Sequence, residues 1–139
     1  MQRSNTAKVH RRTRNDHAAE TAEDYVEAIA TILVERGVCR IVHLTEHFGV
    51  THVTVIKILN RLHKEGLVQL KAQSPILLTA KGRALARRSK ERHETVYQFL
   101  RAIGVPDRVA AEDAEGIEHH VSDATMARFR KVVQTGSLK

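Results

Sequence analysis

The sequence predicts a mainly α-helical protein with one small β-hairpin, arranged as a winged helix-turn-helix followed by further helices. Apolar residues recur at helical spacing along most of the chain, and one pair of short apolar runs flanks a polar turn that contains proline. Only two prolines and seven glycines interrupt 139 residues, and tryptophan is absent. A core of leucine, isoleucine, valine and alanine with few helix breakers favours helices.

The composition is that of a folded, basic protein. Hydrophobic residues make up 42% of the chain and charged residues 28%, with a formal net charge of +7. A basic chain suggests nucleic acid or an anionic surface as its partner. Two acidic stretches, 18–35 and 102–121, interrupt the basic segments and suggest a separate cation-binding function. The length suits one domain, or one domain with a small appendage.

Several classes of protein are not expected. No apolar run approaches the roughly 18 residues that span a bilayer, and the basic start does not resemble a secretory signal. The single Cys39 excludes an internal disulfide and a zinc site built from several cysteines. We therefore expect a cytoplasmic protein without a membrane partner.

The N-terminal quarter of the sequence predicts a disordered basic arm over residues 1–17 and then a helix over 18–36, which Gly37 ends. The arm either touches DNA phosphates or is an inert tail. The helix carries Asp24 and Glu27 three residues apart, so both acids project from one face. They either bind a cation or complement the N-terminal end of the helix dipole.

Residues 41–64 predict a helix-turn-helix, with a short helix over 41–48, a turn at Gly49, and a longer helix over 51–64. Its second helix would enter the DNA major groove. The buried stripe of this helix is expected to contain Val53, Ile56, Leu59 and Leu62, joined by Val55 and Ile58. The candidate DNA-contacting residues are Thr51, His52, Thr54, Lys57 and Arg61. A helical hairpin that packs against another element is the alternative.

Two short apolar runs, 67–70 and 76–79, surround a polar turn and predict a β-hairpin directly after the helix-turn-helix. This order is that of a winged helix. A long helix follows over 83–103 and carries His93 near its middle. A lone histidine there is more often a packed or surface residue than a metal ligand.

An acidic helix is expected over 107–120, and a last helix begins at the Ser122-Asp123 cap. In the acidic helix, Glu115, Glu118 and His119 fall at i, i+3 and i+4 and share one face. Such like charges repel unless a cation lies between them, and Mn, Fe, Co and Zn accept these ligands. The alternative is a solvated acidic face. His120 would point about 100° away from His119, so we leave it out of the predicted site.

Taken in order, these motifs resemble the diphtheria-toxin-repressor family of metal-dependent transcription factors, and especially its manganese-responsive members. The resemblance covers residues 20–133 and rests on the motifs Asp24-Tyr25-Val26-Glu27, Arg92-His93-Glu94 and 113–120. It implies a homodimer, a helical dimerisation domain after the winged helix, and a binuclear site for two Mn(II) ions per subunit. The ligands it implies are Asp24, Glu27, His93, Glu115, Glu118 and His119. Glu27 and Glu118 would bridge the two ions.

The donor types favour manganese. Four carboxylates and two imidazoles form a hard ligand set without sulfur, which suits Mn(II) better than Zn or Cu. Iron-sensing members of the family carry Met and Cys where this chain has Asp24 and Glu115. The resemblance therefore implies a Mn(II)-dependent regulator that represses manganese uptake genes by binding a palindromic operator. The domains expected are an arm over 1–17, a winged helix over 18–82 and a metal-binding and dimerisation domain over 83–139.

Three other readings remain open at this point. The first is an Fe(II)- or Zn(II)-responsive regulator of the same family. The second is a binuclear metal hydrolase, for which the sequence offers no general base besides the ligands; we expect no enzyme. The third is a metal-independent winged-helix regulator, which would leave the six matched donors unexplained.

Overall fold

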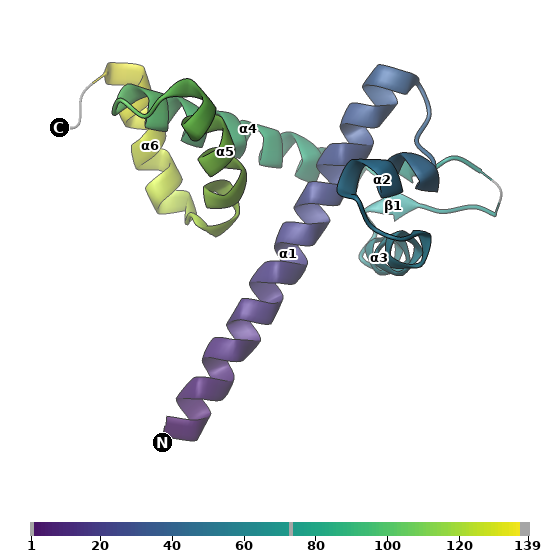
Figure 1. The fold of residues 1–139 in the computed structure, drawn as a ribbon. Coiled ribbons are helices and arrows are strands. Elements are labelled where there is room, and N and C mark those ends of the chain that lie inside the picture. Colours follow the sequence, from purple (N-terminus) through teal and green to yellow (C-terminus); the bar gives the residue numbers. More distant parts are fainter. Residues whose placement is uncertain (1, 73, 137–139) are drawn as a thin grey trace. The chain divides into compact units, whose positions relative to one another are not determined.

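The computed structural model describes residues 2–72 and 74–136, and the side chains of 2–5, 12 and 13 lie outside the description. It is mainly helical with one antiparallel two-stranded sheet, as the sequence predicts (Figure 1). The elements in order are α1 (Gln2–Arg36), α2 (Ile41–Phe48), α3 (His52–Lys64), β1 (Val68–Gln69), β2 (Leu77–Leu78), α4 (Ala80–Ala102), α5 (Asp107–Ile117), the 3-10 turn η1 (Glu118–His120) and α6 (Asp123–Thr135).

The chain divides into two compact units. The winged-helix unit comprises Thr21–Arg87, and the C-terminal unit joins Met1–Glu20 to Arg88–Lys139. The sequence places its boundaries a few residues earlier, after residue 17 and after residue 82. The helices α1 and α4 each contribute one part to each unit.

The start of α1 differs from the sequence prediction. The helix begins at Gln2, so residues 2–17 are helical where a disordered arm is expected. No glycine or proline occurs between residues 2 and 36, and alanine, arginine and glutamate in this stretch have high helix propensity. A helix that is nucleated by the buried face of residues 22–32 can therefore extend toward the N-terminus at little cost.

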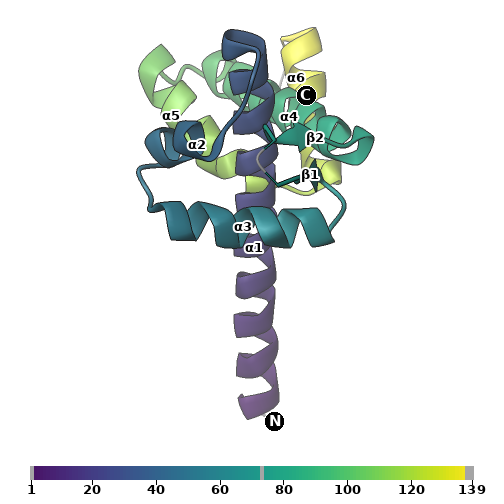
Figure 2. The ribbon, with the colours of Figure 1, turned by 90° about the vertical axis from the view of Figure 1, so that its right-hand side faces the viewer.

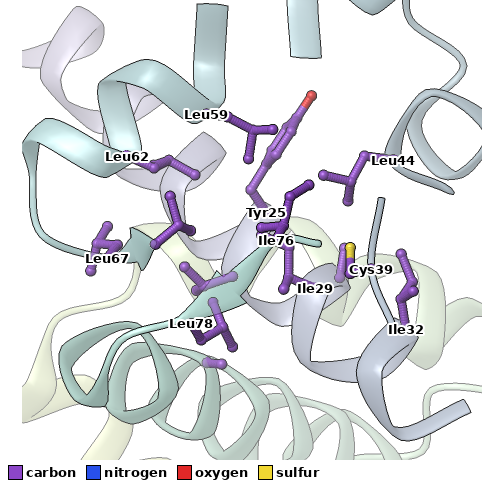
Figure 3. Packing of buried hydrophobic residues seen from close by; sticks show 14 of the residues in the cluster. Tyr25, Ile29, Ile32, Cys39, Leu44, Leu59, Leu62, Leu67, Ile76 and Leu78 are labelled. Carbon is purple, nitrogen blue, oxygen red and sulfur yellow. The ribbon is translucent and has the colours of Figure 1, made fainter. Parts of the chain in front are cut away.

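Buried residues of α1, α2, α3 and the hairpin form one hydrophobic core in the winged-helix unit (Figure 3). The side chains of Ile29 and Leu44 are fully buried there, and the ring of Tyr25 stacks on Phe48 with centroids 4.2 Å apart. Burial of the Tyr25 hydroxyl raises its pKa. The apolar spacing that predicts the first helix thus also supplies the side chains that hold α2 and α3 against it.

The helix-turn-helix has the expected local chemistry. Gly49 ends α2 with a φ of 64°, a left-handed conformation that favours glycine. The Thr51 hydroxyl accepts a hydrogen bond from the Thr54 main-chain nitrogen at 3.2 Å and caps α3. The left-handed Gly49 and the Thr51 cap together fix the sharp turn between α2 and α3.

The buried face of α3 is rotated from the one that the sequence predicts. Val55, Leu59 and Leu62 are buried, whereas Val53 is 75% exposed and Ile56 is 37% exposed. The assignment of Val53 and Ile56 to the buried stripe is therefore wrong. A run with an apolar residue at every second or third position fits two helix faces, and packing against α1 and α2 selects the one centred on Val55 and Leu59.

The wing is short and tied to its surroundings. Val68 pairs with Leu78 and Gln69 pairs with Leu77 in antiparallel register. Figure 2 shows the two strands beside the C-terminal end of α3. The Ile76 main-chain nitrogen also donates to the Cys39 carbonyl at 2.8 Å. The hairpin is thus joined to the connection between α1 and α2 as well as to α3.

The long helix α4 starts at Ala80, three residues before the predicted start. The Thr79 hydroxyl accepts from the Gly82 main-chain nitrogen at 3.0 Å and donates to the Gly66 carbonyl at 2.6 Å. In the C-terminal unit, a second core gathers Val96, Ala114 and Met126. No helix in the described part of the chain is both long and apolar enough to cross a membrane.

Candidate metal centre

The acidic motif does not form one continuous helix. The helix α5 ends at Ile117, and Glu118–His120 form a 3-10 turn rather than the end of the helix over 107–120 that the sequence predicts. Glu115 therefore lies on α5, while Glu118 and His119 lie on the 3-10 turn that follows it. The helix over 107–120 is predicted three residues too long, and a shared face for these three side chains stays a prediction.

An arginine on α4 holds this turn. Arg92 donates through Nη2 to the carbonyl oxygens of Glu118 and Val121, the first at 3.0 Å. Through Nη1 it donates to Asp123 Oδ1, also at 3.0 Å. The Arg92 side chain is only 13% exposed. Its hydrogen bonds satisfy carbonyl groups at the point where the helical pattern ends.

Glu118 is the centre of the candidate site. It is 3% exposed, one of the two buried polar residues in the described part of the chain. Its Oε2 lies 3.8 Å from His93 Nδ1, and its Oε1 lies 3.4 Å from His119 Nε2. We call these three side chains the Glu118 cluster. A buried carboxylate is unfavourable unless positive charge or hydrogen bonds compensate it, and two imidazoles face its two oxygens.

The three members of the cluster come from two elements of the C-terminal unit. His93 lies on α4 and is 25% exposed, while the His119 side chain on η1 is 2% exposed. The neighbouring core residues Val96 and Ala114 fix α4 against α5. The structure thus brings together three of the six predicted ligands.

The other three predicted ligands lie on α5 and on α1. Glu115 is exposed on α5, and no ion pair within residues 2–72 and 74–136 involves it. Asp24 and Glu27 are half-buried on the part of α1 that belongs to the winged-helix unit, one turn apart on one face. Asp24 and Glu27 each have at least one interaction, such as a hydrogen bond or an ion pair, with another group of the protein.

One candidate residue was missed in the sequence. Glu20 Oε2 lies 3.2 Å from His120 Nε2, and Glu20 and His119 can offer ligand atoms within 4.8 Å of each other. These residues are about a hundred positions apart in the chain, so periodicity could not relate them. The signal that was available is the position of Glu20 one turn before Asp24 on the same helix.

The residues of the Glu118 cluster fit a divalent metal ion. Two imidazole nitrogens and a carboxylate are ligands for first-row metals. Ligand atoms bound at about 2.1 Å to one ion lie about 3 Å apart in neighbouring positions, close to the 3.4 Å between Glu118 Oε1 and His119 Nε2.

The predicted DNA-contacting residues lie at the start and along the outer face of α3. Thr51, His52, Thr54 and Lys57 are exposed. The hydroxyls of Thr51 and Thr54 lie 3.0 Å apart. Arg61 is half-buried, and its Nε lies 3.7 Å from Glu65 Oε1. Four of the five side chains are therefore accessible at the end of α3 that a helix-turn-helix presents to DNA.

Two domains of one known protein family match the chain. The N-terminal DNA binding domain of the iron dependent repressor matches residues 17–74, and the metal binding and dimerisation domain of the same repressor matches residues 79–136. The chain belongs to the iron-dependent repressor family. The resemblance to the diphtheria-toxin repressors that the sequence shows is thereby confirmed, with DNA binding, metal binding and dimerisation as properties of the two family domains.

Similar proteins include two transcriptional regulators from bacteria. The transcriptional regulator MntR of Escherichia coli O157:H7 is 41% identical over 129 residues, which are 93% of this chain and 83% of that protein. The HTH-type transcriptional regulator MntR of Bacillus subtilis is 36% identical over 112 residues, 81% of this chain and 79% of that protein.

Solved structures of the family share the fold. The manganese regulator SloR has a TM-score of 0.70 at 30% identity, covering 81% of this chain and 53% of that chain. A manganese-dependent transcriptional repressor in complex with manganese has a TM-score of 0.71 at 29% identity, covering 81% of this chain and 52% of that one. The chain thus spans about half the length of these two structures.

Proposed function

We propose that the chain is a Mn(II)-dependent DNA-binding transcriptional regulator that acts as a homodimer and represses genes for manganese uptake. The observation that carries the proposal is Glu118, a buried carboxylate with an imidazole facing each of its oxygens. The similar structures of the manganese regulator SloR and of a manganese-dependent transcriptional repressor support manganese as the metal. The palindromic operator belongs to the proposal as well, because a symmetric dimer presents two equivalent heads to DNA.

The proposed ligand set extends beyond the Glu118 cluster. With Asp24, Glu27 and Glu115 it contains four carboxylates and two imidazoles, enough for two Mn(II) ions per subunit. The absence of sulfur donors supports a hard metal over Zn or Cu. Glu27 and Glu118 are the proposed bridging carboxylates. The winged helix over 18–82 is the proposed DNA-binding domain, and 83–139 is the metal-binding and dimerisation domain.

The proposed DNA contacts lie in the winged-helix unit, and the proposed metal ligands lie in both units. Thr51, His52, Thr54, Lys57 and Arg61 on α3 are the proposed contacts to bases and phosphates. His93, Glu118 and His119 hold the metal in the C-terminal unit, while Asp24 and Glu27 supply carboxylates from the winged-helix unit. The bound metal supplies positive charge that neutralises these acids. Metal held by these ligands would reduce the freedom of the side chains that bind it, so less ordering would remain when DNA binds.

Fluorescence anisotropy with a labelled duplex tests the function. The duplex is selected from a randomised pool in the presence of Mn(II), and the titration is run at fixed salt with chelator, Mn(II), Fe(II) or Zn(II). We expect tight binding with Mn(II) and weak binding with chelator. Equal binding in all conditions would contradict metal dependence, and a response to Fe(II) or Zn(II) alone would contradict manganese as the effector.

A variant locates the metal site. Glu118→Ala removes the carboxylate between the two imidazoles, and we expect it to abolish the response to Mn(II) while the far-UV circular dichroism stays unchanged. Glu46→Ala is the matched control, because Glu46 is an exposed acid on α2. Retention of the Mn(II) response in Glu118→Ala would refute the assigned site.

A further inference from the structure

Glu20, which lies outside the ligand set of the proposed function, is placed against the Glu118–His120 turn. Its Oε2 lies 3.2 Å from His120 Nε2, and it can offer a ligand atom within 4.8 Å of one from His119. All three residues belong to the C-terminal unit. The Glu20 side chain is 30% exposed, so it is partly shielded from water and can hold a cation together with the nearly buried His119.

We propose that Glu20 is a further metal ligand of this regulator and that His120 orients it. The inference rests on the proposed function, because it places Glu20 at the same metal centre. His120 Nε2 lies at ion-pair distance from Glu20 Oε2, 3.2 Å, so the imidazole faces one carboxylate oxygen and leaves Oε1 for the metal. Outer-shell partners of this kind fix the direction of a carboxylate ligand.

The helix geometry supports the same role. Glu20 precedes Asp24 by four residues on α1, so the two carboxylates project from one face of a continuous helix. Like charges at this spacing destabilise a helix unless positive charge compensates them. The extra carboxylate also makes the donor set harder, which further favours Mn(II) over Zn.

This role explains a histidine that the sequence excludes from the site. On a regular helix His120 would point away from His119, but the 3-10 turn ends the helix at Ile117. The His120 ring is 47% exposed and faces Glu20. A simple surface ion pair is the alternative reading of this contact, and such pairs contribute little to stability. If Glu20 is a metal ligand, Mn(II) binding requires its carboxylate. If Glu20 only forms an ion pair with His120, Mn(II) binding does not.

A Mn(II) titration followed by electron paramagnetic resonance separates them, because free Mn(II) gives a strong signal that binding diminishes. Glu20→Gln keeps the size of the side chain and removes its charge. We expect it to weaken binding of at least one Mn(II) ion by 10-fold or more, in the range of about 10–100-fold found for residues that tune a metal site. We expect a smaller loss for His120→Ala. Glu35→Gln, an exposed acid on the same helix, should bind Mn(II) as the wild type does.

The outcomes are distinct from those that test the proposed function. Wild-type Mn(II) affinity in both Glu20→Gln and Glu20→Ala overturns the role of Glu20, while the wild type and Glu118→Ala still decide the metal centre itself. A wild-type chain that binds no Mn(II) overturns both. Circular dichroism of each variant shows that a loss of affinity does not come from unfolding.

Discussion

Arg92 donates to the carbonyl oxygen of Glu118 at 3.0 Å and to the carboxylate of Asp123 at the same distance. One guanidinium on α4 therefore holds both ends of the segment between α5 and α6. That segment carries Glu118 and His119, two of the proposed metal ligands. The geometry of the metal centre thus depends on a residue that is not itself a ligand.

Replacement of Arg92 by lysine should disturb this arrangement. A lysine ammonium cannot reproduce the planar fork of donors, so carbonyl groups near Glu118 lose partners at about 1–3 kcal/mol for each buried group. We expect Arg92→Lys to lower the thermal stability and to weaken Mn(II) binding by roughly 10–100-fold. Thermal denaturation and a Mn(II) titration measure the two effects.

Arg88 provides the control for Arg92. Its Nη2 also lies near Asp123 Oδ1, at 3.6 Å, but its side chain is 64% exposed. An exposed pair of this kind is worth about 0–1 kcal/mol. Arg88→Lys should therefore behave as the wild type, and equal losses in both variants would contradict a special role for Arg92.

Gly82 should be the least replaceable glycine of the winged-helix unit. A Cβ atom at this position would lie 2.0 Å from the Leu67 carbonyl oxygen, which is main chain and cannot turn away. We expect Gly82→Ala to lower the free energy of unfolding by about 3 kcal/mol or more. Urea denaturation of the variant measures the loss.

Gly116 is the matched comparison within a helix. No atom lies within 4 Å of a Cβ built there, apart from its own helix backbone and its chain neighbours. Alanine has the higher helix propensity, so Gly116→Ala should be neutral or more stable by up to about 1 kcal/mol. A strong destabilisation by Gly116→Ala would show that the packing around α5 differs from the structure.

Two neighbouring valines on α3 should respond differently to truncation. Val55 is fully buried and Val53 is 75% exposed. We expect Val55→Ala to lower the free energy of unfolding by about 2 kcal/mol. Val53→Ala should change it by no more than about 0.5 kcal/mol. Urea denaturation distinguishes the two, and the opposite order would restore the buried face that the sequence predicts.

Much of the fold could be predicted because its signals are local. The cap at Thr51, the left-handed Gly49 and the two apolar runs of the hairpin each depend on residues a few positions apart. The family motifs likewise placed His93, Glu118 and His119 in one predicted site, and the structure brings these three side chains together.

The misses arise from interactions between distant residues. The 3-10 turn at Glu118 is held by Arg92 from another helix, and the contact between Glu20 and His120 spans most of the chain. The exposed Val53 shows a different limit. Its spacing fits two helix faces, and only packing against α1 and α2 decides between them.

Cys39 should be almost inert in the folded protein. It is fully buried, and burial raises the pKa of its thiol from 9.0 to about 11. Because the thiolate is the reactive form, we expect slow reaction with Ellman's reagent at pH 8 in buffer and fast reaction in urea. Absorbance at the wavelength of the released thiolate follows both reactions.

The same shift makes a prediction about alkaline pH. Between pH 9.0 and about 11 the unfolded chain releases the Cys39 proton and the folded chain keeps it. The contribution of this thiol to stability is therefore present below pH 9.0 and is lost as the pH rises through this range. Cys39→Ala should show a shallower loss of stability there than the wild type. Parallel curves for the two proteins would contradict the shift.

The central claim is that manganese binds at Glu118, and anomalous diffraction at the Mn absorption edge tests it most directly. Crystals grown with Mn(II) should show an anomalous peak in bonding contact with the Glu118 carboxylate and with His93 or His119. Crystals that contain Mn(II) at other positions, with no peak beside Glu118, would contradict the account.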